Sequence, residues 1–225
     1  MSGLPAPVVI LISGRGSNLQ AILNEARAGR LPVEIRAVIS NNRAAAGLQI
    51  ATAAGIPTEI VDHRAFSVRV QFDNALMQAI DRYQPRLVIL AGFMRILGEE
   101  FIRHYAGRLL NIHPSLLPAF KGLDTHARAL AAGAKEHGAS VHLVTNDLDG
   151  GPVIIQGKVP VHPGDSAETL AARVLAEEHR IYPLAIKWTA EERLTLRNGQ
   201  VLLDGSVRPE QGLDALPGRR SGILE

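Results

Sequence analysis

Residues 8–18 read VVILISGRGSN, a short apolar run that ends in a glycine-rich turn. The run Val8–Ile12 contains no polar residue, which is typical of a strand buried on both faces of a sheet. In the turn Gly14–Asn18 two glycines allow a sharp change of direction, and we expect a helix to begin near Asn18. A buried strand, a tight turn and a helix form the first unit of an α/β fold.

The same alternation of strand and helix continues along the chain. Strands are expected at Ile35–Ser40, Thr58–Val61, Leu87–Leu90 and Leu109–Ile112, and helices at Ala44–Ala54, Phe72–Tyr83 and Glu99–Tyr105. This order predicts a mostly parallel, doubly wound, Rossmann-like sheet with right-handed crossovers. In such a sheet ligands bind outside the carboxyl ends of the strands.

The pattern changes after residue 138. Ser140–Val144 and Val153–Val159 predict two strands joined by a polar loop, which we interpret as an antiparallel hairpin extending the C-terminal half of the fold. Apolar spacing from Ser166 to Trp188 predicts one long helix, with a kink expected at Pro183. The Gly- and Pro-rich segment 205–225 is expected to be an extended tail.

The composition of the chain excludes several classes of protein. The 225 residues, 46% of them apolar, suit a single domain over 1–225 with a core at about 8–200. A formal charge of only +2 argues against a nucleic-acid surface, and the lack of cysteine excludes thiolate nucleophiles and Cys-ligated zinc. The N-terminal residues resemble neither a signal peptide nor a membrane span, so we expect a cytoplasmic protein without membrane attachment.

The glycine-rich turn is a candidate phosphate site. It directs backbone N–H groups and the positive end of a helix dipole to one point. A dinucleotide fingerprint would require a third glycine or alanine at position 19, where Leu19 stands, and Glu34 precedes its strand. We therefore favour a simple phosphate over NAD, with a turn that binds no ligand as the structural alternative.

Asn111 and His113 are the main candidates for chemistry. Alternation along a strand places both on one face, where an amide donor and an imidazole can stabilise an oxyanion. A carboxylate would stabilise the imidazolium form of His113, and both Asp147 and Asp149 lie in the loop before Gly150–Gly151. Spacing alone does not choose between the two aspartates.

The remaining histidines and serines give weaker signals. His126, His137 and His142 do not have the spacing of a zinc protease, so we expect no metal, and we expect His137 and His142 to form structural hydrogen bonds. Ser115 and Ser140 lack the G-x-S-x-G context of a serine hydrolase. Direct attack by an amine, without a covalent enzyme intermediate, is the remaining interpretation.

Four ordered motifs resemble the phosphoribosylglycinamide formyltransferases of purine synthesis, over about residues 8–188. They are Ile12–Gln20 (ISGRGSNLQ), Ala91–Leu97 (AGFMRIL), Leu110–Pro118 (LNIHPSLLP) and Asp147–Pro152 (DLDGGP). The resemblance implies an enzyme that transfers the formyl group of 10-formyltetrahydrofolate, a co-substrate, to the amine of glycinamide ribonucleotide. It implies small-molecule partners only, with the protein a monomer or a homodimer.

The resemblance also implies roles for individual residues. It assigns catalysis to Asn111, His113 and Asp149, and so selects Asp149 over Asp147. It assigns the ribonucleotide to Gly16, Ser17, Asn18 and Glu178. It assigns the folate to Arg69, Met94, Arg95, Ile96, Leu97, Asn111, Asn146, Asp147, Leu148 and Asp149. Asp124 departs from the family pattern, where histidine is common, and receives no role.

Three alternatives remain at this stage. A formyltetrahydrofolate hydrolase would share Asn111, His113 and Asp149 but use water as acceptor; it usually carries an N-terminal regulatory domain, for which a first strand at Val8 leaves no room. A methionyl-tRNA formyltransferase would be expected to have a second domain and a basic surface. A nucleotide-binding oxidoreductase would use Gly14–Asn18, and Leu19 argues against it.

Overall fold

The computed structural model describes residues 4–207 and contains a seven-stranded sheet in the order β3-β2-β1-β4-β5-β6-β7. The strands are β1 (Ala6–Ile12), β2 (Val33–Ser40), β3 (Thr58–Ile60), β4 (Leu87–Leu90), β5 (Leu109–His113), β6 (Glu136–Leu143) and β7 (Val153–Pro160). Strands β1 to β5 are parallel, whereas β6 is antiparallel to both of its neighbours. The predicted doubly wound sheet with an antiparallel hairpin is confirmed.

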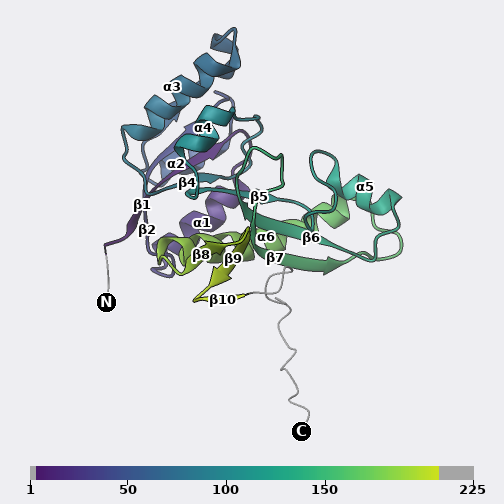
Figure 1. Ribbon diagram of the computed structural model, residues 1–225. Coiled ribbons are helices and arrows are strands. Elements are labelled where there is room, and N and C mark those ends of the chain that lie inside the picture. Colours follow the sequence, from purple (N-terminus) through teal and green to yellow (C-terminus); the bar gives the residue numbers. More distant parts are fainter. Residues whose placement is uncertain (1–3, 208–225) are drawn as a thin grey trace.

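Helices cover both faces of the sheet. They are α1 (Ser17–Arg27), α2 (Gly47–Ala53), the short 3-10 helix η1 (His63–Ala65), α3 (Arg69–Asp81), α4 (Glu99–His104), α5 (Thr125–Ala131) and α6 (Ala167–Ala190). Val8 and Ile10 of β1 pack on the side of α1 and α6, while Val9 and Leu11 pack on the side of α3 and α4. Figure 1 shows these two helical layers on opposite sides of the sheet.

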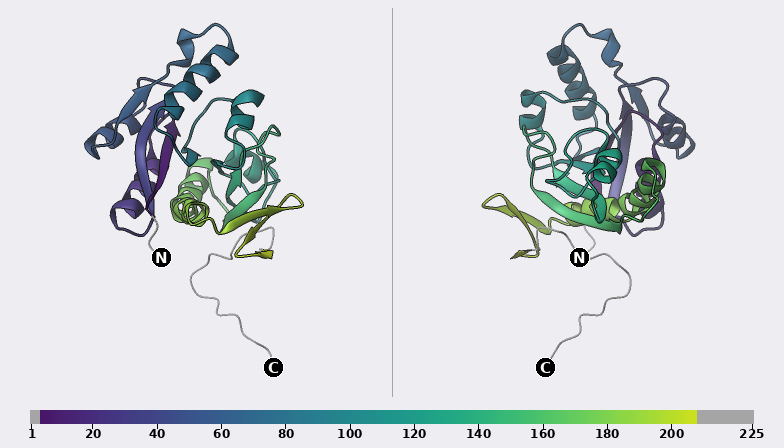
Figure 2. Two further views of the ribbon diagram at one scale, coloured as in Figure 1. Left: turned by 60° about the vertical axis from the view of Figure 1, so that its left-hand side comes forward. Right: turned by 90° about the vertical axis from the view of Figure 1, so that its right-hand side faces the viewer.

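Helix α6 crosses the sheet over β6 and β7 (Figure 2). Ser166 and Thr169 form a capping box at its N-terminus, and the helix continues through Pro183. The buried hydroxyl of Tyr182 lies 2.9 Å from the carbonyl oxygen of Leu90 and 3.2 Å from that of Leu110. The helix is thereby attached to β4 and β5, at whose carboxyl ends the candidate residues lie.

A second sheet of three antiparallel strands was not predicted. It contains β8 (Leu194–Arg197), β9 (Gln200–Leu203) and β10 (Ser206–Val207). The two connections, Asn198-Gly199 and Asp204-Gly205, have positive φ at both residues, as two-residue hairpins require. Ser206 and Val207 therefore belong to a sheet, although we expected a tail from residue 205; the rest of that segment lies outside the described residues.

Some predicted boundaries also differ. Helix α1 begins at Ser17 because Gly16 is its N-cap, and α2 is shorter than the predicted Ala44–Ala54. Strand β6 begins at Glu136, four residues before the prediction, and helix α5 was not predicted. Within residues 4–207, no helix has the length and apolar composition needed to cross a membrane.

Candidate functional site

The glycine-rich turn leads from the carboxyl end of β1 into α1. Gly16 has a φ of 81°, in the left-handed region that favours glycine. A Cβ atom here would lie 2.6 Å from the Cα of Gly47, because α2 packs closely against the turn. Since Gly16 has no side chain that could cap α1, the first N–H groups of the helix are available to an anion.

Asn18 and Glu178, both predicted to bind the same substrate, lie in contact. The amide nitrogen of Asn18 donates a 2.7 Å hydrogen bond to the carboxylate of Glu178 across the α1–α6 interface. Burial raises the pKa of Glu178, and the hydrogen bond from Asn18 partly opposes this rise. The buried Oδ1 of Asn18 has no hydrogen-bond partner among the described residues and can accept a hydrogen bond from a ligand.

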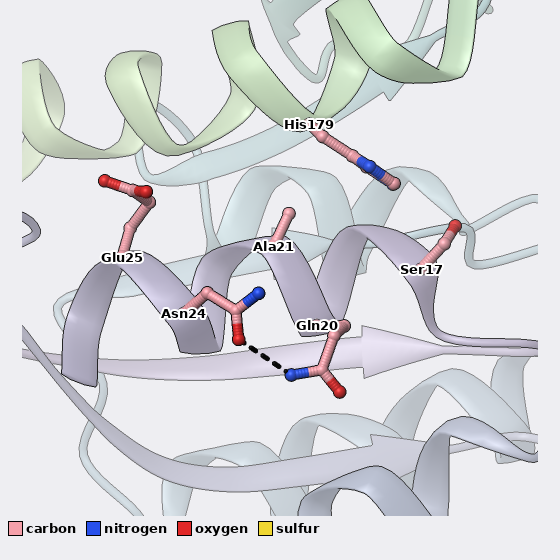
Figure 3. A pocket seen from close by; sticks show the side chains of 6 residues that line it. All are labelled: Ser17, Gln20, Ala21, Asn24, Glu25 and His179. Carbon is pink, nitrogen blue, oxygen red and sulfur yellow. Dashed lines mark hydrogen bonds between the residues drawn. The ribbon is translucent and has the colours of Figure 1, made fainter. Parts of the chain in front are cut away.

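Ser17 lines a neighbouring cavity of about 370 Å³ between α1 and α6 (Figure 3). Its wall is formed by Ser17, Gln20, Ala21, Asn24, Glu25 and His179. The Nε2 atom of His179 is buried and forms no hydrogen bond with any described residue, and burial lowers the pKa of this imidazole. Sequence reasoning missed His179, although it directly follows Glu178.

Asn111 faces His142 on the adjacent antiparallel strand. The Nδ2 of Asn111 lies 3.2 Å from Nε2 of His142, whose Nδ1 lies 2.9 Å from the carbonyl oxygen of Leu143. These contacts assign the proton of His142 to Nδ1, so that Nε2 accepts from Asn111. Burial lowers the pKa of His142, which favours this neutral form. One of the two Asn111 amide protons remains available to a ligand.

His113 and Asp149 form a buried pair. The Nδ1 of His113 lies 3.4 Å from Oδ2 of Asp149, and about nine-tenths of each side chain is buried. The Nε2 of His113 lies 3.1 Å from the carbonyl oxygen of Phe120. Both ring nitrogens of His113 therefore lie near oxygen acceptors.

The structure separates the two aspartates that sequence spacing left open. Asp149 has a φ of 48° and accepts a 2.9 Å hydrogen bond from the backbone N–H of Gly122. Asp147 is exposed instead and forms an ion pair with Lys121 at 2.9 Å. Only Asp149 is therefore placed to stabilise a charge on His113.

Asp149 also borders a cavity of about 530 Å³. Pro118, Lys121 and the loop 149–154 line this cavity together with Gly199 and the start of β9 at Gln200 and Val201. The unpredicted C-terminal sheet thus reaches the edge of the candidate site.

Besides Asn111 in β5, the residues predicted to bind folate lie in three segments. Arg69 begins α3, and its side chain lies beside Gly98, directly after Met94–Leu97. In that segment Met94 and Ile96 are exposed, Leu97 is buried, and Arg95 lies over the ring of Phe72. Asn146 and Leu148 are exposed in the loop before Asp149. Met94, Ile96 and Leu148 offer apolar surface that a flat ring could cover.

His126 and His137 lie in contact with each other. The Nε2 of His137 lies 3.2 Å from Nδ1 of His126, and burial is the main reason why the pKa of His137 falls to about 4. Asp124, which received no role, is exposed at the N-cap of α5. In residues 4–207, no group of three or more His, Cys, Asp or Glu side chains is arranged to bind a metal.

His142 forms the structural hydrogen bonds expected from the sequence, but its contact with Asn111 was not predicted. The pairing of β5 with β6 sets Asn111 opposite His142, and His113 opposite Ser140. Alternation within one strand identified Asn111 and His113, but only the antiparallel register brings His142 to them. We saw no sequence signal for that register.

The chain is similar to known proteins over most of its length. The sequence profile described as formyl transferase matches residues 6–186. The chain is 53% identical to phosphoribosylglycinamide formyltransferase of Escherichia coli K12 over 92% of this chain and 98% of the relative. A crystal structure of phosphoribosylglycinamide formyltransferase from Coxiella burnetii is 54% identical, with a TM-score of 0.88, covering 92% of this chain and 98% of that one.

A more distant match bears on the hydrolase alternative. A formyltetrahydrofolate deformylase from Pseudomonas putida KT2440 is 31% identical, with a TM-score of 0.80, covering 90% of this chain and 71% of that one. A protein named as a deformylase therefore also has this fold.

Proposed function

We infer that this chain, which belongs to the formyl transferase family, transfers the formyl group of 10-formyltetrahydrofolate to the amine of N1-(5-phospho-D-ribosyl)glycinamide. The products are N-formylglycinamide ribonucleotide and tetrahydrofolate, as a step of purine synthesis. The observation that carries this conclusion is the convergence of Asn111, His113 and Asp149 at the carboxyl end of β5 in a chain of this family.

The chemistry is direct acyl transfer. The substrate amine attacks the formyl carbon, and the carbonyl oxygen becomes an oxyanion that accepts from the free amide proton of Asn111 and from Nε2 of His113. The formyl oxygen replaces the carbonyl of Phe120 as the acceptor for His113. The C–N bond to folate then breaks, and the proton lost by the amine passes to the folate nitrogen through His113 or water. Asp149 stabilises His113 in the steps in which the imidazole is protonated.

The two substrates approach this centre from different segments. The phosphate of the ribonucleotide binds the N–H groups of Gly16, Ser17 and Asn18, while Glu178 contacts its ribose or glycinamide portion. The formyl-folate lies against Arg69, Met94–Leu97 and Asn146–Asp149. The buried Asn18–Glu178 hydrogen bond supports this assignment, because it places a polar pair that is open to a further partner beside the phosphate turn.

We expect no NAD or metal to take part, and we place the enzyme in the cytoplasm as a monomer or homodimer without nucleic-acid partners. The missing third glycine, with Leu19 at its position, supports the absence of NAD. A thermal-shift titration with NAD that raises the melting temperature would contradict this part of the proposal.

The decisive experiment is an amine-dependence assay. Purified protein is mixed with 10-formyltetrahydrofolate, with and without glycinamide ribonucleotide, and folate deformylation is followed by absorbance. Turnover that requires the amine supports the transferase. Deformylation at the same rate without the amine would instead identify a hydrolase, the alternative favoured by the likeness to the Pseudomonas deformylase.

A further inference from the structure

Ser13 is the last residue before the glycine-rich turn, and its contacts reach the neighbouring strand. Strands β1 and β4 are paired side by side in the sheet (Figure 1). The backbone N–H of Ser13 donates a 3.1 Å hydrogen bond to the carbonyl of Gly92, just after β4. Its hydroxyl oxygen accepts a 2.7 Å hydrogen bond from the N–H of Met94. Ser13 therefore holds the backbone at both Gly92 and Met94, where the segment Met94–Leu97 begins.

The proton of the Ser13 hydroxyl has a fixed direction. It is donated to Oδ1 of Asn41 over 2.6 Å, and the side chain of Asn41 is buried at 3% exposure. The Nδ1 of His63 lies 3.0 Å from the backbone oxygen of Asn41 and 3.3 Å from its Nδ2. The direction of the Ser13 proton follows from the Met94 N–H, which can only donate. Because its proton is committed to Asn41, the Ser13 oxygen presents lone pairs to Met94.

The backbone at this turn needs such support. Gly92 has a φ of 74°, and the side chain of Met94 is 74% exposed, so little packing restrains it. At the other end of the segment, the N–H of Gly98 donates a 2.9 Å hydrogen bond to Asp73. Between these two polar contacts lie the residues that contact folate in the proposed function.

We propose that Ser13 is a positioning residue that shapes the Met94–Leu97 segment for the formyl-folate and joins it to the turn that binds the phosphate of the amine substrate. The proposal rests on the function inferred above. Ser13 touches neither substrate and acts through the backbone of Gly92 and Met94. Its loss should weaken the binding of folate more than the chemical step.

The first test is amide exchange of the wild-type protein, measured by NMR. The hydrogen bond to Ser13 predicts that the Met94 N–H is protected although the residue is exposed. Rapid exchange at Met94 in the wild type would overturn the proposal without the need for any variant. In Ser13→Ala this protection should be lost, while strand β1 stays protected.

The second test separates binding from chemistry. Ser13→Ala should raise the KM for 10-formyltetrahydrofolate and the Kd for tetrahydrofolate about 3- to 10-fold, the effect of one lost hydrogen bond, with kcat within about twofold. Ser206→Ala, which removes an exposed hydroxyl from the small sheet, is the matched control and should change neither quantity.

The outcomes distinguish the two proposals. If the wild type fails to transfer the formyl group to the amine, the proposed function is wrong, whatever Ser13 does. If the wild type is active and Ser13→Ala retains its KM and Kd, the inference about Ser13 is wrong and the function stands. A fall in kcat at unchanged KM would also overturn the positioning role.

Discussion

The side-chain amide of Asn111 has two protons that can each donate a hydrogen bond. One of its protons is directed at His142, and the other is free for the formyl oxygen. We expect Asn111→Ala to lower kcat by about 10²–10³, the usual effect of removing one oxyanion donor. Steady-state kinetics measure this, with thermal unfolding as the check that the variant is folded. Near-normal turnover would contradict the proposed role.

The two aspartates of the same loop provide a matched pair of variants. Asp149 is buried against His113, whereas Asp147 is exposed beside Lys121. Asp149→Asn removes the charge that stabilises the imidazolium, and we expect kcat to fall on the order of 10²-fold. Asp147→Asn should change kcat less than about threefold. Equal effects of the two substitutions would contradict the assignment.

His137 should make the stability of the protein depend on pH. Burial lowers its pKa from an ordinary value of 6.5 to about 4, so the unfolded chain binds this proton more readily between these values. Its contribution to stability is complete above pH 6.5 and is lost as the pH falls towards 4. Between pH 7 and pH 5 the free energy of unfolding should fall by about 2 kcal/mol less in His137→Gln than in the wild type. Urea unfolding at both pH values measures this difference.

At the level of secondary-structure elements, the junction of β1, α1 and α2 depends on Gly16. Gly16 and Gly29 both have positive φ, but only at Gly16 would a Cβ meet another backbone atom, the Cα of Gly47 at 2.6 Å. We expect Gly29→Ala to cost about 1 kcal/mol from backbone strain alone, and Gly16→Ala clearly more.

Urea unfolding of the two glycine variants measures this difference. Gly16→Ala should also raise the KM for glycinamide ribonucleotide, because α2 or the turn must move to accommodate the methyl group. Equal destabilisation by the two variants would show that the close packing of α2 against Gly16 does not add to the cost of the substitution.

The elements differ in how well the sequence predicts them. The apolar runs of β1 and β4 are buried on both faces, and this continuous pattern identified them. Helix α5 has only seven residues, and Thr125 and Ala129 are its only buried residues, so it carries no clear apolar stripe. The hairpins at Asn198-Gly199 and Asp204-Gly205 did carry a turn signal in the sequence, but no strands were predicted beside it.

On the scale of the whole molecule, α6 joins the parallel and antiparallel parts of the sheet. The hydroxyl of Tyr182 is fully buried against the carbonyls of Leu90 and Leu110, and burial raises its pKa far above the ordinary value. Tyr182→Phe keeps the packing but removes this donor, and we expect it to lower the free energy of unfolding by about 1–2 kcal/mol. An unchanged unfolding midpoint in urea would contradict this.

The class of fold followed from local patterns, whereas the assembly of the site did not. Each strand and helix signal lies within a few residues, but the contact of His113 with Asp149 and that of Asn111 with His142 join residues far apart in the chain. Resemblance selected Asp149, and no pattern within β6 distinguished His142 from a core histidine. Such contacts depend on how distant strands pair, and the local spacing of apolar residues does not reveal that pairing.

The register of β5 with β6 has an evolutionary consequence. Asn111 is paired with His142 and His113 with Ser140, so one residue gained or lost inside β6 would turn the following side chains to the opposite face of the sheet. The connection 132–135 between α5 and β6 is mostly exposed and can change length without shifting this pairing. Among descendants of a common ancestor, insertions and deletions should therefore accumulate in 132–135 and be eliminated by selection between Glu136 and His142.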